Sequence, residues 1–212
     1  MKVIEQFSSI QGESTYAGLP CVFIRLSGCN LRCGYCDTQY AYDGGAEITV
    51  DDIARRVKET GINLVEVTGG EPLLQGEETL SLIRKLLEEG HEVLVETNGS
   101  KSIKGIDGRA VVVMDLKTPG SGMSGEMDFS NLESIKPSDE IKFVICDRGD
   151  YDWSKQVISD YGLVGRCVLL FSAASGRLAP RDLSEWVLKD GLDVRINVQM
   201  QKYIFGPEER GV

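Results

Sequence analysis

Short apolar runs alternate with segments of helical period along most of the chain. Each apolar run is short and rich in β-branched or aromatic residues, which is typical of buried strands. The strands are predicted at residues 21–26, 64–67, 92–96, 110–114, 141–145 and 167–171, with a last one at 193–198. Amphipathic helices are predicted at residues 49–60, 77–89, 151–161 and 181–189. This alternation indicates βα units and a parallel sheet.

Two connections lack a helical period, residues 97–109 and 115–140, and are rich in Gly, Ser, Lys and Asp. Six strands are too few for a closed eight-stranded barrel. We therefore expect an α/β fold, an open partial barrel of about six parallel strands with reduced crossover helices, in a single domain of residues 1–212. Residues 8–15 are polar and contain glycine, so a loop is predicted there.

The helix boundaries and faces can also be predicted. Thr49 followed three residues later by Asp52 resembles a capping box, and Gly61 is placed to end that helix. The inward faces are predicted from the helical period. They are Ile53, Ala54 and Val57 in the first helix, Leu80, Ile83, Leu86 and Leu87 in the second, Trp153, Val157, Ile158 and Tyr161 in the third, and Leu183, Trp186 and Val187 in the fourth.

Composition narrows the class of protein. A formal net charge of −10 disfavours broad binding to nucleic acid or an anionic membrane. No apolar run reaches 18 residues, and the start lacks the apolar region of a signal peptide. Six cysteines, three of them clustered, do not indicate a disulfide framework. We expect a protein of the reducing cytoplasm.

The clustered cysteines are Cys29, Cys33 and Cys36, spaced C-x3-C-x2-C. A structural zinc site takes four protein ligands. The nearest other cysteine, Cys21, lies in an apolar run, and no histidine is nearby. Three thiolates suit an iron–sulfur cubane with one iron left open. A three-thiol zinc site or a loop of free cysteines is the alternative.

The spacing resembles that of the radical S-adenosylmethionine (SAM) superfamily, whose three cysteines ligate a [4Fe-4S] cluster while SAM chelates the fourth iron. Residues 68–72, Thr-Gly-Gly-Glu-Pro, resemble the motif of that superfamily that contacts the SAM amino group. The resemblance covers most of the chain and implies a six-stranded partial barrel, which agrees with the strand pattern.

Polar residues follow the predicted strand ends, where parallel barrels place their active sites. The resemblance implies SAM contacts there, although Tyr35 could equally be a packed tyrosine and Lys117 a solvated charge. The implied contacts are Tyr35, Cys36, Asp37, Gly70, Glu71, Glu96, Asn98, Lys117, Ser121 and Ser172.

Within the superfamily, the chain is similar to the 7-carboxy-7-deazaguanine synthase family. The similarity rests on Gln11-Gly12-Glu13, on Arg25, on Cys36-Asp37-Thr38 and on the ending at residues 199–206. That family converts 6-carboxy-5,6,7,8-tetrahydropterin to 7-carboxy-7-deazaguanine with loss of ammonia in queuosine biosynthesis. The resemblance implies a homodimer, a requirement for Mg2+, and an electron-donor protein such as flavodoxin or ferredoxin.

The resemblance also implies residue roles. Gln11, Gly12, Glu13, Arg25 and Thr68 would contact the pterin, and the Thr38 hydroxyl would bind Mg2+. A turn hydroxyl is the alternative for Thr38, and a rim salt bridge for Arg25.

The chain departs from the family pattern at three places. Ser14 stands where glycine is frequent, Gln201 where histidine is expected, and residues 172–174 lack an expected proline. Two other functions remain open at this point. One is an activase that places a glycyl radical on a partner enzyme, and the other is a zinc-binding module without catalysis.

The remaining histidine and cysteines are not expected at the site. His91 is the only histidine and precedes a strand, at the opposite mouth, which disfavours a Ser-His-Asp or Cys-His hydrolase. Cys21, Cys146 and Cys167 lie in or beside apolar strands and are predicted to belong to the core.

Overall fold

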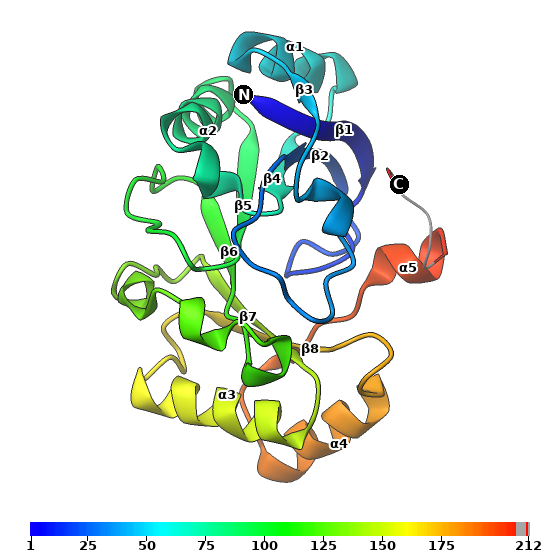
Figure 1. The fold of residues 1–212 in the computed structure, drawn as a ribbon, viewed down its shortest axis with the longest axis vertical. Coiled ribbons are helices and arrows are strands. Elements are labelled where there is room, and N and C mark those ends of the chain that lie inside the picture. The colour runs from blue at the N-terminus through cyan, green and yellow to red at the C-terminus, as the bar shows by residue number, and fades with distance from the viewer. Residues whose placement is uncertain (207–210, 212) are drawn as a thin grey trace.

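The computed structural model describes residues 1–206 and 211. Figure 1 shows one curved sheet running through this part of the chain, with helices packed on its outside. The strands are β1 Lys2–Ile10, β2 Pro20–Leu26, β3 Ala46–Glu47, β4 Leu64–Gly69, β5 Glu92–Thr97, β6 Val111–Asp115, β7 Glu140–Ile145, β8 Val168–Ala173 and β9 Arg195–Ile196.

The strand order is β3-β1-β2-β4-β5-β6-β7-β8-β9. Neighbours from β2 to β9 are parallel, whereas β1 pairs antiparallel with both β2 and β3. Over the described residues the sheet ends at β3 and β9 and does not close. The predicted open, mostly parallel α/β fold is therefore confirmed, and the added antiparallel edge lengthens it.

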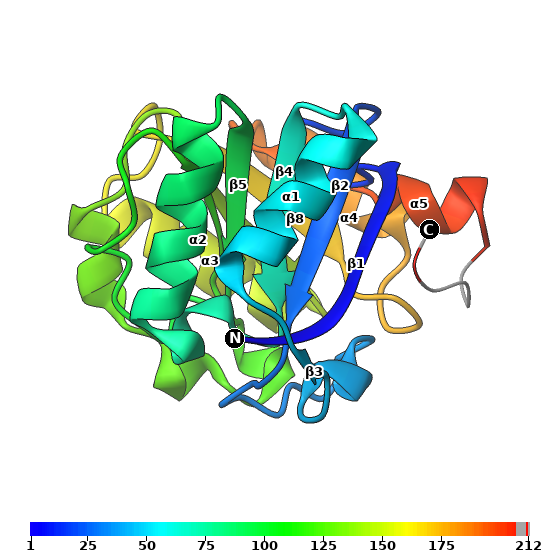
Figure 2. The same ribbon diagram turned by 90° about the horizontal axis from the view of Figure 1, so that it is seen from above.

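Helices α1 and α2 lie side by side against the outer face of β2, β4 and β5, as Figure 2 shows from above. The helices are α1 Val50–Thr60, α2 Glu77–Glu88, α3 Arg148–Asp160, α4 Pro180–Asp190 and α5 Met200–Ile204. The connection from β6 to β7 holds only the short 3-10 turns η3 Pro119–Ser121, η4 Ser124–Glu126 and η5 Phe129–Glu133. Two further turns are η1 Gln39–Ala41 and η2 Pro72–Gln75. The expected reduction of crossover helices is thus confirmed.

Local sequence signals predicted some boundaries of helices and strands correctly and others wrongly. The Thr49 side chain accepts the backbone N–H of Asp52 at 3.1 Å, and Gly61 ends α1 with φ of 70°. Residues 8–10, predicted as loop, belong to β1, because their backbone pairs with β2 from Pro20 onwards. The sequence prediction also missed β3 and α5, which are too short to show a period.

Two predicted helix faces were partly wrong. In α2 the fully buried positions are Thr79, Leu82, Ile83 and Leu86, whereas Leu80 and Leu87 are only half-buried. Tyr161 is 42% exposed, because α3 ends one residue before it. Its ring stacks on Phe129 with centroids 5.3 Å apart.

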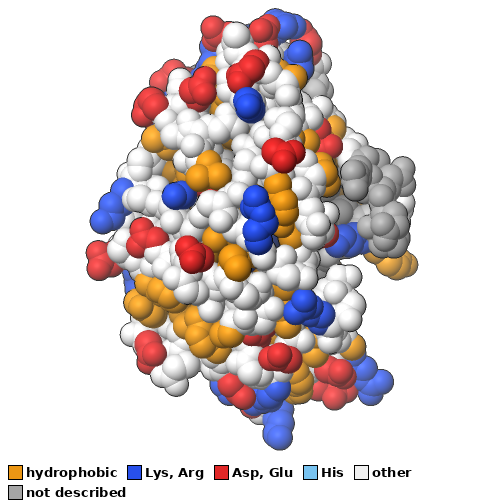
Figure 3. Space-filling view, in the orientation of Figure 1, with side chains coloured by type: hydrophobic (Ala, Val, Ile, Leu, Met, Phe, Trp, Pro, Cys, Tyr) orange, Lys and Arg blue, Asp and Glu red, His pale blue; other side chains and the backbone are white. Residues whose placement is uncertain are grey.

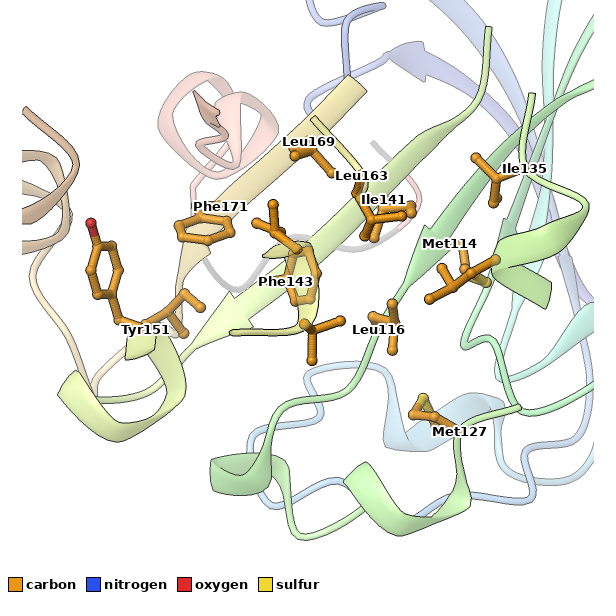
Figure 4. Close-up of a cluster of buried hydrophobic side chains, with 14 of the residues drawn as sticks. Met114, Leu116, Met127, Ile135, Ile141, Phe143, Tyr151, Leu163, Leu169 and Phe171 are labelled. Carbon is orange, nitrogen blue, oxygen red and sulfur yellow. The ribbon is translucent and has the colours of Figure 1, made fainter. Parts of the chain in front are cut away.

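The alternation of side chains along the strands separates the core from the site. Outward residues such as Ile141 and Phe143 belong to a buried cluster that also contains Tyr151 of α3. Figure 4 shows these side chains gathered on one side of the sheet. Phe143 meets Phe171 edge to face at 5.5 Å between ring centroids. A second cluster lies under α1 and α2 and includes Ile24, Val65 and Leu86. The other set of alternate residues faces the inside of the curve.

Further features of the fold concern the surface, the remaining cysteines and the histidine. The face in Figure 3 mixes Lys and Arg with Asp and Glu rather than gathering one sign. In the described part of the chain, no helix has the length and apolarity needed to cross a membrane. Cys21 and Cys146 are buried as predicted, while Cys167 is half-buried beside the core. His91 lies ahead of β5, with a ring nitrogen 3.3 Å from the carbonyl oxygen of Asn63.

Candidate active site

A cavity of 740 Å³ opens inside the curve of the sheet, at the carboxyl ends of the strands. It collects residues from the loop after β1, from the cysteine loop after β2, from β4 to β8 and from the segment before and within α5. Small-molecule sites span about 300–1,000 Å³, so this cavity has the size of a ligand site. The topology places it where parallel barrels carry their active sites.

Nearly all the predicted site residues line this cavity. They are Gln11, Gly12, Glu13, Arg25, Cys29, Cys33, Tyr35, Cys36, Asp37, Thr38, Thr68, Gly70, Glu96, Asn98, Lys117 and Ser172. The two predicted residues whose side chains are turned away are Glu71 and Ser121, which are 0% and 2% exposed. The structure therefore brings together segments that are far apart in sequence.

The three thiols project from one loop and are free and half-buried. Among the described residues, no three His, Cys, Asp or Glu side chains converge as they would around a single metal ion. Three thiols in one loop suit an iron–sulfur cubane with one iron left open, whereas a structural zinc site takes four protein ligands. The sequence of the loop offers no fourth thiol or imidazole.

Close backbone packing fixes the cysteine loop. A Cβ at Gly70 would lie 2.3 Å from the carbonyl oxygen of Gly28 and 2.6 Å from Cβ of Cys29, so glycine is required there. On the other side, the N–H of Gly34 donates to the Ser121 carbonyl at 3.0 Å. Arg177 donates to the Gly34 carbonyl, also at 3.0 Å.

The Glu71 carboxylate is used within the protein rather than presented to the cavity. It accepts the hydroxyl of Thr97 at 2.9 Å and the backbone N–H of Leu73 at 3.0 Å. Ser121 behaves in the same way, because its hydroxyl donates to the Thr118 carbonyl at 2.6 Å. Any contact of these two residues with a ligand must come from their backbone.

A charged network crosses the floor of the cavity. Lys142, on β7, donates to Glu13 at 3.1 Å and to Glu96, and its Nζ lies 3.8 Å from Asp115 Oδ2. Asp115 also pairs with Lys117 at 2.7 Å. The Thr68 hydroxyl donates to Glu96 at 3.2 Å. The network joins the loop after β1 to four neighbouring strands, β4 to β7.

Burial and charge act in opposite directions on these groups. Burial alone would raise the pKa of Glu96, but the ammonium of Lys142 overcomes it and the pKa is lowered. Burial would lower the pKa of Lys142, but Glu13 and Glu96 raise it well above its usual value. Burial, together with the nearby carboxylate of Glu96, raises the pKa of Glu66 to about 8, although the hydrogen bond from Gln11 and the Lys142 ammonium act in the opposite direction.

The conformation of the loop after β1 is held by a hydrogen bond to Glu66 and by contacts within the loop itself. The Gln11 carboxamide donates to Glu66 and accepts the N–H of Glu13 at 3.1 Å, so both of its ends are occupied. Ser14 follows with φ of 66°, a left-handed conformation that favours glycine. Arg25 donates to Glu5 at 2.7 Å, and its guanidinium carbon lies 5.9 Å from the centre of the Tyr40 ring.

The segment 197–202 covers one side of the cavity. Most of its contacts with the site were not predicted from the sequence. Asn197 and Gln199 donate to the Glu13 carboxylate at 3.3 and 3.0 Å. The N–H of Met200 donates to the Gly12 carbonyl at 2.9 Å. Lys202 pairs with Asp37 at 2.8 Å. These contacts attach the loop after β1 and the cysteine loop to the same segment.

Lys142 and Glu66 were also not predicted as site residues, although the sequence carries a signal for them. Each is a charged residue in the middle of an otherwise apolar strand. In a sheet with a packed outer face, such a residue must face inward, and it therefore marks the site.

The open, mostly parallel sheet, with three cysteines in the loop after its first parallel strand, defines a radical SAM protein. Residues 23–108 match the radical SAM superfamily. The crystal structure of QueE from Escherichia coli has a TM-score of 0.77 and covers 94% of this chain and 93% of its own, at 22% identity. That likeness concerns the fold.

Curated relatives narrow the class. The 7-carboxy-7-deazaguanine synthase of Koribacter versatilis is 40% identical over 226 residues, with all of both chains covered. The one of Chlorobaculum tepidum is 42% identical over 215 residues, covering 100% of this chain and 97% of its own. The chain belongs to the 7-carboxy-7-deazaguanine synthase family of radical SAM lyases. The activase and zinc-module hypotheses receive no support from these relatives.

Membership of the superfamily implies a [4Fe-4S] cluster and SAM.

Proposed function

We propose that the protein converts 6-carboxy-5,6,7,8-tetrahydropterin to 7-carboxy-7-deazaguanine, with loss of ammonia, in queuosine and deazapurine biosynthesis. One observation carries the proposal: the three thiols and the Gln11-Gly12-Glu13 segment line the same cavity. The full-length similarity to named synthases supports the same reaction. Residues 1–212 would act as a single domain.

Cys29, Cys33 and Cys36 would hold the cluster, with SAM on the fourth iron. When bound, these groups would supply the radical chemistry that removes a hydrogen atom from the substrate. Two buried atoms beside the thiols, the Tyr35 hydroxyl and Asp115 Oδ1, have no hydrogen-bond partner within the described chain. They suit the hydroxyl and amino groups of SAM. The proposed SAM contacts are Tyr35, Cys36, Asp37, Gly70, Glu71, Glu96, Asn98, Lys117, Ser121 and Ser172.

The pterin would lie between the thiols and the loop after β1. Glu13 offers a carboxylate to the amino and ring N–H groups of its guanine-like face. Gln11 orders this loop, since its carboxamide is occupied by Glu66 and Glu13. Gly12 would contribute backbone, and Arg25 and Thr68 would contact the remainder of the substrate.

Thr38 would bind Mg2+ together with the substrate carboxylate. Its hydroxyl donates to Asp37 Oδ1 at 3.0 Å, which leaves its oxygen lone pairs for a cation. A single neutral oxygen is a weak ligand for Mg2+, so the ion would bind mainly when the substrate is present.

The proposal includes partners and compartment. An electron-donor protein such as flavodoxin or ferredoxin would reduce the cluster, and the free thiols suit a reducing cytoplasm. The protein would act as a homodimer. Tyr203 and Ile204, which are 92% and 48% exposed, offer apolar surface on α5 that is consistent with an interface.

The direct test is anaerobic incubation of the cluster-loaded protein with SAM, dithionite, Mg2+ and 6-carboxytetrahydropterin, followed by mass analysis. The expected result is 7-carboxy-7-deazaguanine with one ammonia per product. Cys33→Ala should give neither product nor 5′-deoxyadenosine, whereas Cys167→Ala should retain both. SAM cleavage with no change in the pterin would contradict the proposed substrate.

A further inference from the structure

Lys142 is the cation around which the acidic groups of the cavity are arranged. Its side chain is 7% exposed and comes from β7, directly opposite Asp115 in the sheet register. Glu13 reaches it from the loop after β1, and Glu96 reaches it from β5. The network therefore depends on one ammonium group that the pattern of cysteines and glycines does not reveal.

The donors of Lys142 are directed at protein groups. An ammonium has three N–H donors. One is directed to Glu13 at 3.1 Å and one to Glu96, and Asp115 lies 3.8 Å from the same nitrogen. Lys142 is therefore arranged to position other side chains rather than to bind a ligand itself.

Without Lys142, four acidic side chains would face the same space. They come from four elements and are Glu13, Glu66, Glu96 and Asp115. Lys117 is the other lysine in contact with this group, and it pairs with Asp115. Among the described residues, Glu13 would keep only the amides of Asn197 and Gln199. Repulsion from the neighbouring carboxylates would then turn the Glu13 side chain away, which changes the acceptor that it presents to a ligand.

We propose that Lys142 is a positioning residue that holds the Glu13 carboxylate in place as an acceptor and thereby sets the specificity of the site for a 2-amino-4-oxopyrimidine face. This inference rests on the proposed function, because it takes a pterin as the ligand. A carboxylate acceptor held at this place favours the 2-amino group and disfavours a 2-oxo group, whose oxygen would face the carboxylate.

The test compares two unreactive fluorescent probes, 6-carboxypterin and 6-carboxylumazine, which differ at position 2. Their dissociation constants are measured by fluorescence anisotropy on the cluster-loaded protein with SAM, under anaerobic conditions. The parent should bind the pterin about tenfold or more tightly than the lumazine, which is the size expected for a buried charged hydrogen bond. Lys142→Met should reduce that ratio to within about threefold.

Further variants separate specificity from general damage. Lys142→Arg keeps the charge and should retain most of the discrimination. Lys142→Gln should fall between the parent and Met, and it covers the case in which the Met variant does not fold. Lys136→Met removes a half-buried ion pair with Asp139, away from the cavity, and should leave the ratio unchanged. Loss of packing alone would weaken both probes equally.

The outcomes distinguish the two proposals. A parent that binds neither probe contradicts the proposed function. A parent that binds 6-carboxypterin but does not discriminate overturns the inference. Full discrimination in Lys142→Met, or in Lys142→Gln if Met does not fold, also overturns it while leaving the proposed function intact.

Discussion

The backbone N–H of Asn98 donates to Glu71 Oε2 at 2.7 Å, and this bond joins the loop after β4 to the loop after β5. The same carboxylate accepts the Thr97 hydroxyl and the N–H of Leu73. Burial raises the pKa of Glu71, while the backbone N–H groups of Asn98 and Leu73 favour its charged form. Glu71 therefore stabilises both loops that border Cys29.

Replacing Glu71 with Ala should lower the free energy of unfolding by about 3–5 kcal/mol, because several buried donors lose their acceptor. The iron content after reconstitution should fall as well, since Gly70 packs against Cys29. Urea unfolding and iron analysis measure these effects. Glu88→Ala, on the exposed side of α2, is the matched control. Equal stability of the two variants would show that Glu71 is not a structural acceptor.

Ser14 is the one non-glycine residue of the described chain with positive φ, at 66°. Ser14→Gly should keep the free energy of unfolding within about 1 kcal/mol of the parent, because the relief of strain offsets the lost bond from the Tyr16 N–H. Ser14→Val should lower it by about 1–2 kcal/mol, since a branched side chain fits this conformation poorly. Thermal unfolding gives the comparison. Pterin affinity should fall only in the Val variant, because Glu13 is adjacent.

The raised pKa of Glu66, about 8 against an ordinary 4.5, links its proton to stability. The folded protein retains this proton over a range in which the unfolded chain has lost it. The stabilising effect is therefore complete below pH 4.5 and is lost as the pH rises to about 8. The parent should lose up to about 1.4 kcal/mol of stability per pH unit in that window, relative to Glu66→Gln. Urea unfolding at several pH values, monitored by circular dichroism, measures the difference. Parallel pH profiles would contradict the assignment.

Thr38 offers a test of the proposed magnesium site. Thr38→Ala should keep the cluster and bind SAM, yet lose most of the stimulation by Mg2+, because the ligand oxygen is gone. Thr38→Ser should retain the stimulation, since only a methyl group is lost. Turnover with and without Mg2+ in the three proteins provides the measurement. Undiminished stimulation in the Ala variant would mean that the Thr38 hydroxyl serves only its bond to Asp37.

The sequence allowed the fold and most of the cavity to be predicted for physical reasons. Buried parallel strands appear as apolar runs, and their carboxyl ends carry the polar residues that meet in the cavity. The roles of Glu71 and Ser121 could not be predicted, because a motif does not show whether a side chain turns outward or back to the backbone. The contacts of Asn197 and Gln199 with Glu13 join residues nearly two hundred positions apart, and no local pattern records them.

The attachment of Glu13 to the segment 197–202 also affects when the site is completed. The bond from the Ser14 N–H to Asn197 spans 183 residues, and the bond from Gln199 to Glu13 spans 186. Contacts of such separation form slowly and only after the intervening chain has been made. A nascent chain on the ribosome can therefore form the first βα units early, yet the loop after β1 is completed only once the segment 197–202 has been made.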